Sequence, residues 1–421
     1  MIERVGRAMI AVVMVVLLTT ASGLGTSAGV AQAASRVKNV SLQVGATSTV
    51  HHLSWYARAV SGQSVQVRQR PADGRWSGPA RTVPARAHRT SERGWVGLRA
   101  VVAGLEAGRT YLYRVGSGRG GWSSTGTFTV PAGDHGTFIA LGDPQLAHRG
   151  RSVRGADGWR RTVESATTRH PRARFLLSVG DQVNDPRSVS EWDAFYAPTR
   201  LRGYRLATVP GNHDVARRST TYGEHVHLPG LAPAGRTVAG TGDYHFVDGA
   251  TLVVGLNSNE KRVEVHRDHL RRVVAANPAR WIVVVMHHAP FSGAGHLHDA
   301  DVRAFRARLT PEFSRLGVDL VLSGHDHSYV RTHLMTGAAV SHRTGPAPAT
   351  VRPGPREVMY LTLDSSSGSK HYALEGKVPW AAVRHQGMRP SYTAVTTSPT
   401  SLVATTYDDR GARVDSVTLQ R

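Results

Sequence analysis

Five short polar clusters stand out because each one directly follows an apolar, β-rich run. The five segments are TFIALGDPQ (137–145), RFLLSVGDQVN (174–184), RLATVPGNHD (205–214), WIVVVMHHAP (281–290) and VDLVLSGHDH (318–327). The polar side chains at their ends are Asp143, Gln145, Asp181, Asn212, His213, His287, His288, His325 and His327. The chain has no cysteine, so any metal here must be held by imidazole, carboxylate and amide donors, which suit Mn, Fe and Zn.

Each cluster alone has an ordinary structural explanation. Gly-Asp-Pro at 142–144 is a common turn, and paired histidines at a strand end can simply be buried and hydrogen-bonded. The five clusters together indicate a site, because in α/β sheets ligands bind beyond the carboxyl ends of the strands. We therefore expect all five to converge on one face of one sheet.

Phosphoester hydrolysis explains this mixture of donors. A phosphoester is anionic and repels hydroxide, and two divalent ions about 3.5–4 Å apart neutralise it and lower the pKa of a shared water. A carboxylate can bridge the two ions, since each of its oxygens can take one. Two aspartates leave the ions a net positive charge that attracts phosphate, and this accounts for the neutral His, Asn and Gln donors in the other places.

The elements that must position these residues form two parts. Helical patterns at 156–170, 262–276 and 300–316 alternate with the apolar runs, which predicts an α/β layered domain, and 244–256 predicts a hairpin within it. The chain returns to β-type patterns from about residue 356, and we expect this tail to complete a second sheet.

Residues 36–131 instead read as short β-type runs separated by turn residues, which predicts an all-β sandwich. Their last part, with Leu105, Thr110, Tyr111 and Tyr113, resembles the end of a fibronectin type III domain.

The first 34 residues predict a Sec-type signal peptide. Arg4 and Arg7 precede a short apolar run at 9–18, and Ala31-Gln-Ala33 fits a cleavage site. The run is too short to span a bilayer comfortably. We expect a secreted protein with no transmembrane anchor after cleavage.

The net charge of +22 is explained first by a GC-rich genome that codes arginine freely, and a general attraction for anionic partners such as phosphates is the alternative. Its arginines are spread along the chain, with no basic block and no interleaved aromatic residues of the kind that single-strand binders use. A specific nucleic-acid partner is therefore not expected.

The order Asp, Gly-Asp, Gly-Asn-His, His, Gly-His-x-His resembles that of the calcineurin-like metallophosphoesterases. The segment GHDHSYVRT (324–332) and the fibronectin-like domain in front resemble the purple acid phosphatase branch. The resemblance implies a four-layer αββα catalytic domain over 135–421, preceded by the sandwich at 36–131.

The resemblance also implies the ligand set. The bridging ligand would be Asp181, and Asp143 and His327 would bind the first metal, with Gln145 as a further candidate. The second metal would be bound by Asn212, His287 and His325, with His287 favoured over His288.

Substrate-facing roles are implied for His213 and His296, with His298 as an alternative to His296. These histidines would stabilise the phosphoryl oxygens or protonate the leaving group. Asp214 would either orient His213 or be solvated.

Two positions depart from the resemblance. Purple enzymes place a tyrosine three residues after the bridging Asp, where this chain has Asn184, so we expect a colourless enzyme. Generic relatives use Asp-x-His in the first motif, where this chain has Gln145. A bacterial subgroup with a fibronectin-like domain also carries Asp-Pro-Gln, so Gln145 resembles an accepted variant.

The function favoured is a secreted phosphomonoesterase that holds two metal ions (Fe, Mn or Zn) and attacks with a metal-bridging hydroxide. Its substrate would be a phosphorylated small molecule or polymer. A phosphodiesterase or nucleotidase on the same scaffold, and a non-catalytic protein that binds a cell-wall polymer or a partner, are the alternatives.

Overall fold

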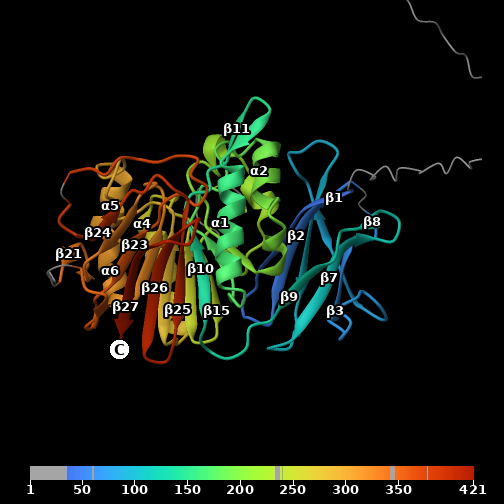
Figure 1. Ribbon diagram of the computed structural model, residues 1–421, viewed down its shortest axis with the longest axis horizontal. Helices are drawn as coiled ribbons and strands as arrows, with labels where there is room; N and C mark the ends of the chain where they lie inside the picture. The colour runs from blue at the N-terminus through green and yellow to red at the C-terminus, as the bar shows by residue number, and fades with distance from the viewer. Residues whose placement is uncertain (1–35, 59–60, 233–237, 239, 342–346, 377) are drawn as a thin grey trace, which may run out of the picture. The chain divides into compact units, whose positions relative to one another are not determined.

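The computed structural model describes residues 36–58, 61–232, 238, 240–341, 347–376 and 378–421. The expected signal peptide at 1–34 lies outside the described residues. Residues 36–421 form one compact unit (Figure 1). Among the described residues, no helix has the length and apolar character needed to cross a membrane.

The N-terminal part is an all-β sandwich, as predicted. One face consists of β1 (Val37–Val44), β2 (His51–Ala57), β6 (Val96–Val102) and β5 (Arg86–His88). The other consists of β4 (Arg81–Pro84), β3 (Ser64–Gln69), β7 (Thr110–Ser117), β8 (Gly121–Trp122) and β9 (Gly126–Thr129). Tyr111 and Tyr113 are two residues apart on β7, so both pack beside Phe128 in the core between the faces.

Two further sheets pack face to face in the catalytic region. The first contains β22 (Thr350–Val351), β27 (Arg413–Gln420), β26 (Ser401–Asp408), β25 (Ser391–Thr397), β10 (Thr137–Leu141), β13 (Leu176–Ser178) and β14 (Leu206–Thr208). The second contains β15 (Tyr244–Asp248), β16 (Thr251–Leu256), β17 (Trp281–Met286), β18 (Leu320–Ser323), β23 (Met359–Thr362), β19 (Tyr329–Thr332) and β24 (Ala381–His385). Apolar side chains of both sheets, such as Leu177 and Val283, form one core between them.

Helices cover the outer faces of these two sheets, which confirms the predicted αββα order (Figure 1). The first sheet carries α1 (Ala156–Arg169) and α2 (Val189–Tyr196), and the second carries α4 (Val263–Ala276), α5 (Ala300–Arg308) and α6 (Thr310–Leu316). The prediction of one helix over 300–316 was wrong. The helix is broken because Pro311, which has no backbone N–H to continue a helix, lies in the first turn of α6.

The polar clusters follow strands of both sheets, so the prediction that they share one sheet was wrong. In the first sheet β10, β13 and β14 pair in parallel and carry three clusters at their carboxyl ends. In the second sheet β17 and β18 pair in parallel and carry the other two. Parallel pairing places the carboxyl ends of neighbouring strands at the same edge, and packing of the two sheets brings both edges together.

The sandwich and the catalytic region share a sheet. Strand β14 pairs in parallel with β1 at Leu206 and Gln43, which makes an eleven-stranded sheet from β22 to β5. From the sequence we expected the C-terminal tail to complete a second sheet. The structure instead divides the tail between both sheets. Strand β23 joins the second sheet, whereas β25, β26 and β27 extend the first.

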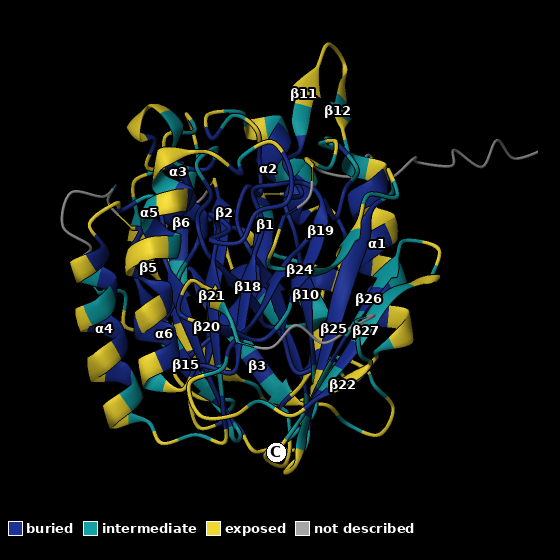
Figure 2. Ribbon diagram, turned by 90° about the vertical axis from the view of Figure 1, so that its left-hand side faces the viewer, coloured by how far each residue is buried: buried dark blue, intermediate teal, exposed yellow. Residues whose placement is uncertain are grey.

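The remaining elements lie mainly in the connections. They are β11 (Ala147–Arg149), β12 (Ser152–Arg154), η1 (Thr199–Gly203), η2 (Ala216–Arg218), α3 (Thr221–His225), β20 (Met335–Thr336) and β21 (Ala339–Val340). The β11–β12 hairpin directly follows the first polar cluster and projects outward (Figure 2).

Candidate metal centre

The loops that carry the predicted ligands have an unusual backbone. Ten described non-glycine residues have positive φ, and five of them are predicted ligands. These five are Asp143, Gln145, Asp181, His325 and His327. Such conformations are costly for residues with a Cβ and persist where surrounding structure imposes them, often at functional sites.

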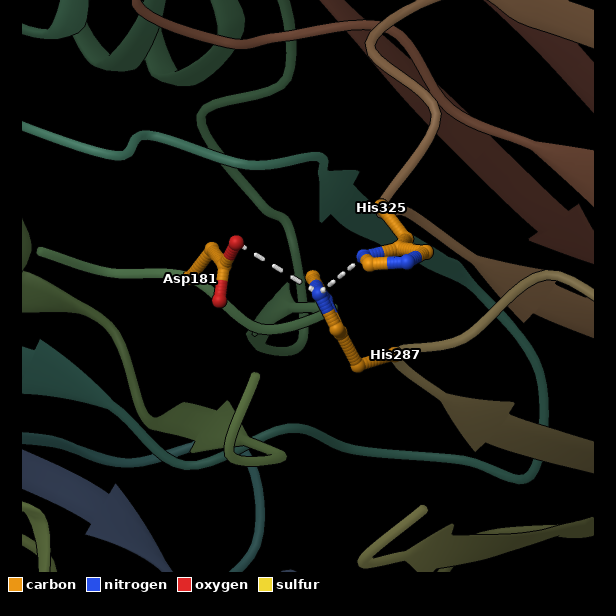
Figure 3. A group of neighbouring side chains, drawn as sticks. All are labelled: Asp181, His287 and His325. Atoms are coloured by element: carbon orange, nitrogen blue, oxygen red, sulfur yellow. Dashed lines mark hydrogen bonds and ion pairs between the residues drawn. The ribbon is translucent and has the colours of Figure 1, made fainter. Parts of the chain in front are cut away.

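Two groups of side chains that could each hold a metal share one residue. Asp181, His287 and His325 have ligand atoms within 4.8 Å of one another, and so do Asp143, Asp181 and His327. Asp143, Asp181 and His327 form the first group, and Asp181, His287 and His325 form the second. Figure 3 shows the second group, with the His287 ring between Asp181 and His325. The shared carboxylate is that of Asp181, the residue predicted to bridge two metals.

The first group suits a cation because two oxygen atoms in it, or beside it, accept no hydrogen bond. Both Asp143 Oδ2 and Gln145 Oε1 are buried and have no hydrogen-bond partner among the described residues. The Gln145 amide is fixed by its other atom, since Nε2 donates to Asn184 Oδ1 at 3.2 Å. The His327 Nε2 atom lies 3.8 Å from Asp143 Oδ1. Unpartnered buried acceptors are costly unless a cation or another donor meets them.

The second group brings three further ligand atoms together. His287 Nε2 lies 3.0 Å from Asn212 Oδ1, 3.1 Å from His325 Nδ1 and 3.5 Å from Asp181 Oδ2. The other ring nitrogen of His287, Nδ1, is 3.1 Å from the Val179 carbonyl and donates to it. This leaves the Nε2 lone pair directed at the cluster, the arrangement of a metal-ligating histidine.

Burial also sets the protonation of these groups. It lowers the pKa of His287, His325 and His327, so their rings are neutral, as metal ligation requires. Burial, followed by the neighbouring Asp181, raises the pKa of Asp143. A cation between the two carboxylates would oppose this effect by stabilising their charged forms.

His288 lies behind the cluster, and both of its ring nitrogens have partners. Its Nδ1 is 2.8 Å from Ser258 Oγ, and its Nε2 is 3.1 Å from Lys261 Nζ. Its ring packs against that of His325, with the centroids 4.6 Å apart. His288 therefore has no ring nitrogen free for a metal, and His287 stays the predicted ligand.

The two predicted substrate-facing histidines border the second group. His213 donates its backbone N–H to Asp181 Oδ1 at 2.9 Å, and its Nδ1 lies 2.8 Å from the Asn184 carbonyl. The His296 ring stacks on His325 at 3.7 Å, and its Nδ1 lies 2.7 Å from Asp299 Oδ2.

The alternative to His296, His298, is exposed, and its side chain makes no hydrogen bond or ion pair with another described residue. It therefore lacks the contacts that tie His296 to the cluster.

Both explanations offered for Asp214 were wrong. This side chain is fully buried and accepts backbone N–H bonds from Gln182 at 2.9 Å and from Gly211 at 2.7 Å. It therefore ties the loop after β13 to the loop after β14 and does not orient His213. A buried carboxylate between two loops gives no recognisable signal in the sequence.

Asp326 is a second anchor that the sequence did not reveal. It is fully buried and accepts bonds from the backbone N–H groups of Gly293, Ala294 and His296, at 2.6 to 3.0 Å, and from the Ser292 hydroxyl at 2.7 Å. It therefore fixes the loop that carries His296. Its place between two predicted ligands was the signal that could have pointed to it.

A serine-rich loop supports the first cluster from a distant part of the chain. Its serines donate to the carbonyl groups of residues 142–144 and are Ser365, Ser366, Ser367 and Ser369. The carbonyl of Lys370, the next residue, accepts from His327 Nδ1 at 3.1 Å. The loop therefore holds the strained backbone around Asp143 and orients His327.

Two glycines of the motifs are explained by contact with the carboxylates. A Cβ on Gly211 would collide with the Asp181 carboxylate, and a Cβ on Gly324 would collide with that of Asp143. Tyr329 and Arg331 of the last motif instead point away from the centre and bind Asp415, at 2.8 and 2.7 Å.

Known families and relatives match the same segments. Residues 136–329 match the Calcineurin-like phosphoesterase family, and residues 37–130 match the family described as Purple acid Phosphatase, N-terminal domain. Acid phosphatase type 7 of Mus musculus is 27% identical over 315 residues, which cover 68% of each chain. Purple acid phosphatase 1 of Ipomoea batatas is 30% identical over 117 residues, 27% of this chain and 22% of that protein.

An uncharacterized protein of Mycobacterium tuberculosis is 33% identical over 96 residues, so the match spans only 17% of that relative's length. Among solved structures, a purple acid phosphatase from yellow lupin (Lupinus luteus) seeds superposes with a TM-score of 0.74 at 14% identity and covers 92% of this chain and 75% of its own. The fold is shared. Residues 136–329 therefore form a calcineurin-like metallophosphoesterase domain, and a purple acid phosphatase N-terminal domain at residues 37–130 precedes it.

Proposed function

We propose that the protein is a secreted dinuclear-metal phosphoesterase that hydrolyses phosphate monoesters. The observation that carries the proposal is the sharing of Asp181 by two groups of potential ligands. A carboxylate that lies between two metal positions belongs to both groups, as Asp181 does. The names of the mouse and sweet potato relatives, an acid phosphatase and a purple acid phosphatase, agree with this activity.

The donor set supports two bound cations and an anionic substrate. The proposed ligands are Asp143, Gln145, Asp181, Asn212, His287, His325 and His327, of which only two are carboxylates. Two divalent ions would supply Lewis-acid stabilisation of the phosphate and lower the pKa of a water at the centre. With only two carboxylates to offset them, such a site attracts a phosphate dianion. We expect Fe, Mn or Zn, and no purple colour, since Asn184 replaces the tyrosine.

His213 and His296 would handle the substrate. The carbonyl of Asn184 fixes Nδ1 of His213 as a donor, and Asp299 does the same for Nδ1 of His296. In both rings Nε2 is then the atom left to meet a phosphoryl oxygen or the leaving group. A protonated Nε2 can donate its proton to the departing oxygen.

The test is a metal and activity analysis of the purified full chain. We expect close to two metal ions per chain, and hydrolysis of p-nitrophenyl phosphate after addition of Mn, Fe or Zn. Asp181→Asn should lower this rate by a factor of about 1000 or more. Asp268→Asn, at an exposed position on α4, is the matched control and should keep full activity.

Different outcomes separate the alternatives. Faster hydrolysis of bis-p-nitrophenyl phosphate or of a nucleotide would replace the monoesterase with a phosphodiesterase or nucleotidase. If the correctly folded protein hydrolyses none of these substrates with any of the metals, the remaining alternative is a non-catalytic binding protein. Secretion is tested separately, by locating the protein in culture medium and determining the N-terminus of the mature chain.

A further inference from the structure

A groove of about 1060 Å³ lies at the amino ends of the strands whose carboxyl ends carry the metal centre. It is lined by the segment from β9 to β10, the turn after α1, and the η1 segment that precedes β14. The metal-binding loops follow β10, β13 and β14 instead. Because β10 is five residues long, roughly 15 Å separates the groove from the metal centre.

The lining of this groove is strongly basic. It contains no Asp or Glu, and it contains six arginines, which are Arg169, Arg172, Arg174, Arg200, Arg202 and Arg205. Arg172 and Arg200 are exposed, and neither forms an ion pair with a carboxylate of the described residues. The chain has 30 acidic residues, but none of them lines the groove. The arginines of the lining therefore give the groove a local positive potential.

Two of these arginines are buried and still have donors to spare. Arg174 and Arg205 are 8% and 2% exposed, and both bind Asp248, at 2.5 and 2.7 Å. Although burial alone would raise the pKa of Asp248, these two arginines hold it below its usual value. Yet Arg174 Nη2 and Arg205 Nη1 have no acceptor among the described residues.

Other nitrogens of the lining are in the same state. Arg202 Nε and His170 Nε2 are buried and have no partner in the described part of the chain. The buried guanidinium N–H groups among these, Arg174 Nη2, Arg205 Nη1 and Arg202 Nε, need an acceptor, and a ligand rich in oxygen atoms would provide several at once.

We propose that this groove binds a linear anion that carries several phosphate groups. The guanidinium fork matches phosphate oxygens in pairs, and several such groups in one groove can contact successive phosphates of a chain. The site is separate from the metal centre. It would hold a polyanion on the protein while the metal centre remains free for a monoester.

The experiment titrates the full-length, metal-loaded protein with inorganic tripolyphosphate by calorimetry. The test variant is R172Q/R200Q, which removes two exposed charges from the groove. The matched control is R75Q/R303Q, which removes two exposed charges elsewhere. We expect R172Q/R200Q to bind tripolyphosphate at least about tenfold more weakly than the wild type, and the control to bind like the wild type.

The same titration in an Asp181→Asn background separates the groove from the metal centre and prevents turnover of the probe. Groove binding should persist there. Unchanged affinity in R172Q/R200Q, equal weakening in the control, or loss of binding in the Asp181→Asn background would each overturn the proposal. Because the titration needs no catalysis, its outcome does not depend on the proposed hydrolysis. Unfolding temperatures of all variants check that the fold is retained.

Discussion

Two groups of buried histidines in this molecule look alike at first and differ in what surrounds them. The metal-centre histidines are His287, His325 and His327. The junction histidines, which lie where the sandwich meets the catalytic region, are His52, His88, His225 and His227. Burial lowers the pKa of every member of both groups.

The junction histidines are surrounded by rings and backbone carbonyl groups. His225 stacks between Tyr56 and Trp192, with centroid distances of 4.6 and 4.5 Å. His52 Nδ1 lies 2.8 Å from the carbonyl of His227. Such contacts suit neutral rings, although Nδ1 of His88 and Nδ1 of His227 have no hydrogen-bond partner among the described residues.

The metal-centre histidines instead face two carboxylates and two amide oxygens, and His325 and His327 lie on backbone with positive φ. Burial and a lowered pKa are therefore common to packing and to metal binding. The metal centre differs in two respects. Its oxygen acceptors converge on one place, and two of them accept no hydrogen bond. The loops that carry them have a strained backbone.

The largest expected effect comes from removing one histidine of each group. His287→Ala should abolish metal retention at one position and lower the hydrolysis rate about 1000-fold, because a ligand is lost. His225→Ala should keep the activity per folded molecule but lower the free energy of unfolding by about 2 kcal/mol, because a packed ring is lost. Metal analysis, kinetics and urea unfolding measure these effects, and the comparison fails if the two variants behave alike.

The anchor Asp326 should have the next largest effect. In Asp326→Ala the loop that carries His296 loses four hydrogen bonds, so we expect kcat to fall by about 30-fold while two metals stay bound. Asp319→Asn is the control, because Asp319 is also buried and lies in the same segment but bonds Ile282 and Arg421 instead. A purely structural role for Asp326 would lower the unfolding temperature of both variants and leave kcat unchanged in both.

Acidification should destabilise the junction. Burial lowers the pKa of His227 to about 3, so in the folded protein it stays neutral while the unfolded chain takes up a proton below about pH 6.5. Stability is therefore complete above this pH and falls as the pH decreases, by about 3 kcal/mol at pH 4.5 for this residue. Besides burial, His52, Arg99 and His88 disfavour protonation of His227. Elsewhere in the junction, Lys38 disfavours protonation of His225, and Glu224 favours that of His88.

Urea unfolding of the metal-stripped protein at pH 7.5 and 4.5 measures this effect. His227→Gln should reduce the pH dependence, whereas His148→Gln, at an exposed position, should keep it. Equal pH dependence in all three proteins would show that the junction histidines do not titrate on unfolding.

The smallest expected effect concerns Gln145. If its free Oε1 ligates the first metal, Gln145→His should tighten retention of one ion, and Gln145→Ala should loosen it, each by roughly tenfold. Competition with a chelator measures both. Identical retention in the two variants and the wild type would mean that Gln145 only shapes the turn.

The sequence by itself determined the family, the sandwich in front, the αββα layers and the identity of the polar clusters. The family and the αββα layers followed from the resemblance of the motifs, whereas the sandwich and the strand-end clusters followed from local periodicity and a rule of topology. Apolar runs predict strands, and the carboxyl ends of parallel strands meet at an edge, so the positions of the clusters along the chain already indicated their meeting.

Only the tertiary structure decided how the centre is held. Ser365 lies 222 residues after Asp143, whose carbonyl it supports, and Asp326 lies 30 residues after His296. No local pattern links such pairs. The same is true of the pairing of β14 with β1, and of the groove, whose arginines come from two separate segments. Local rules set which residues could bind a metal, whereas contacts between distant segments set which donors stay free and which loops are strained to present them.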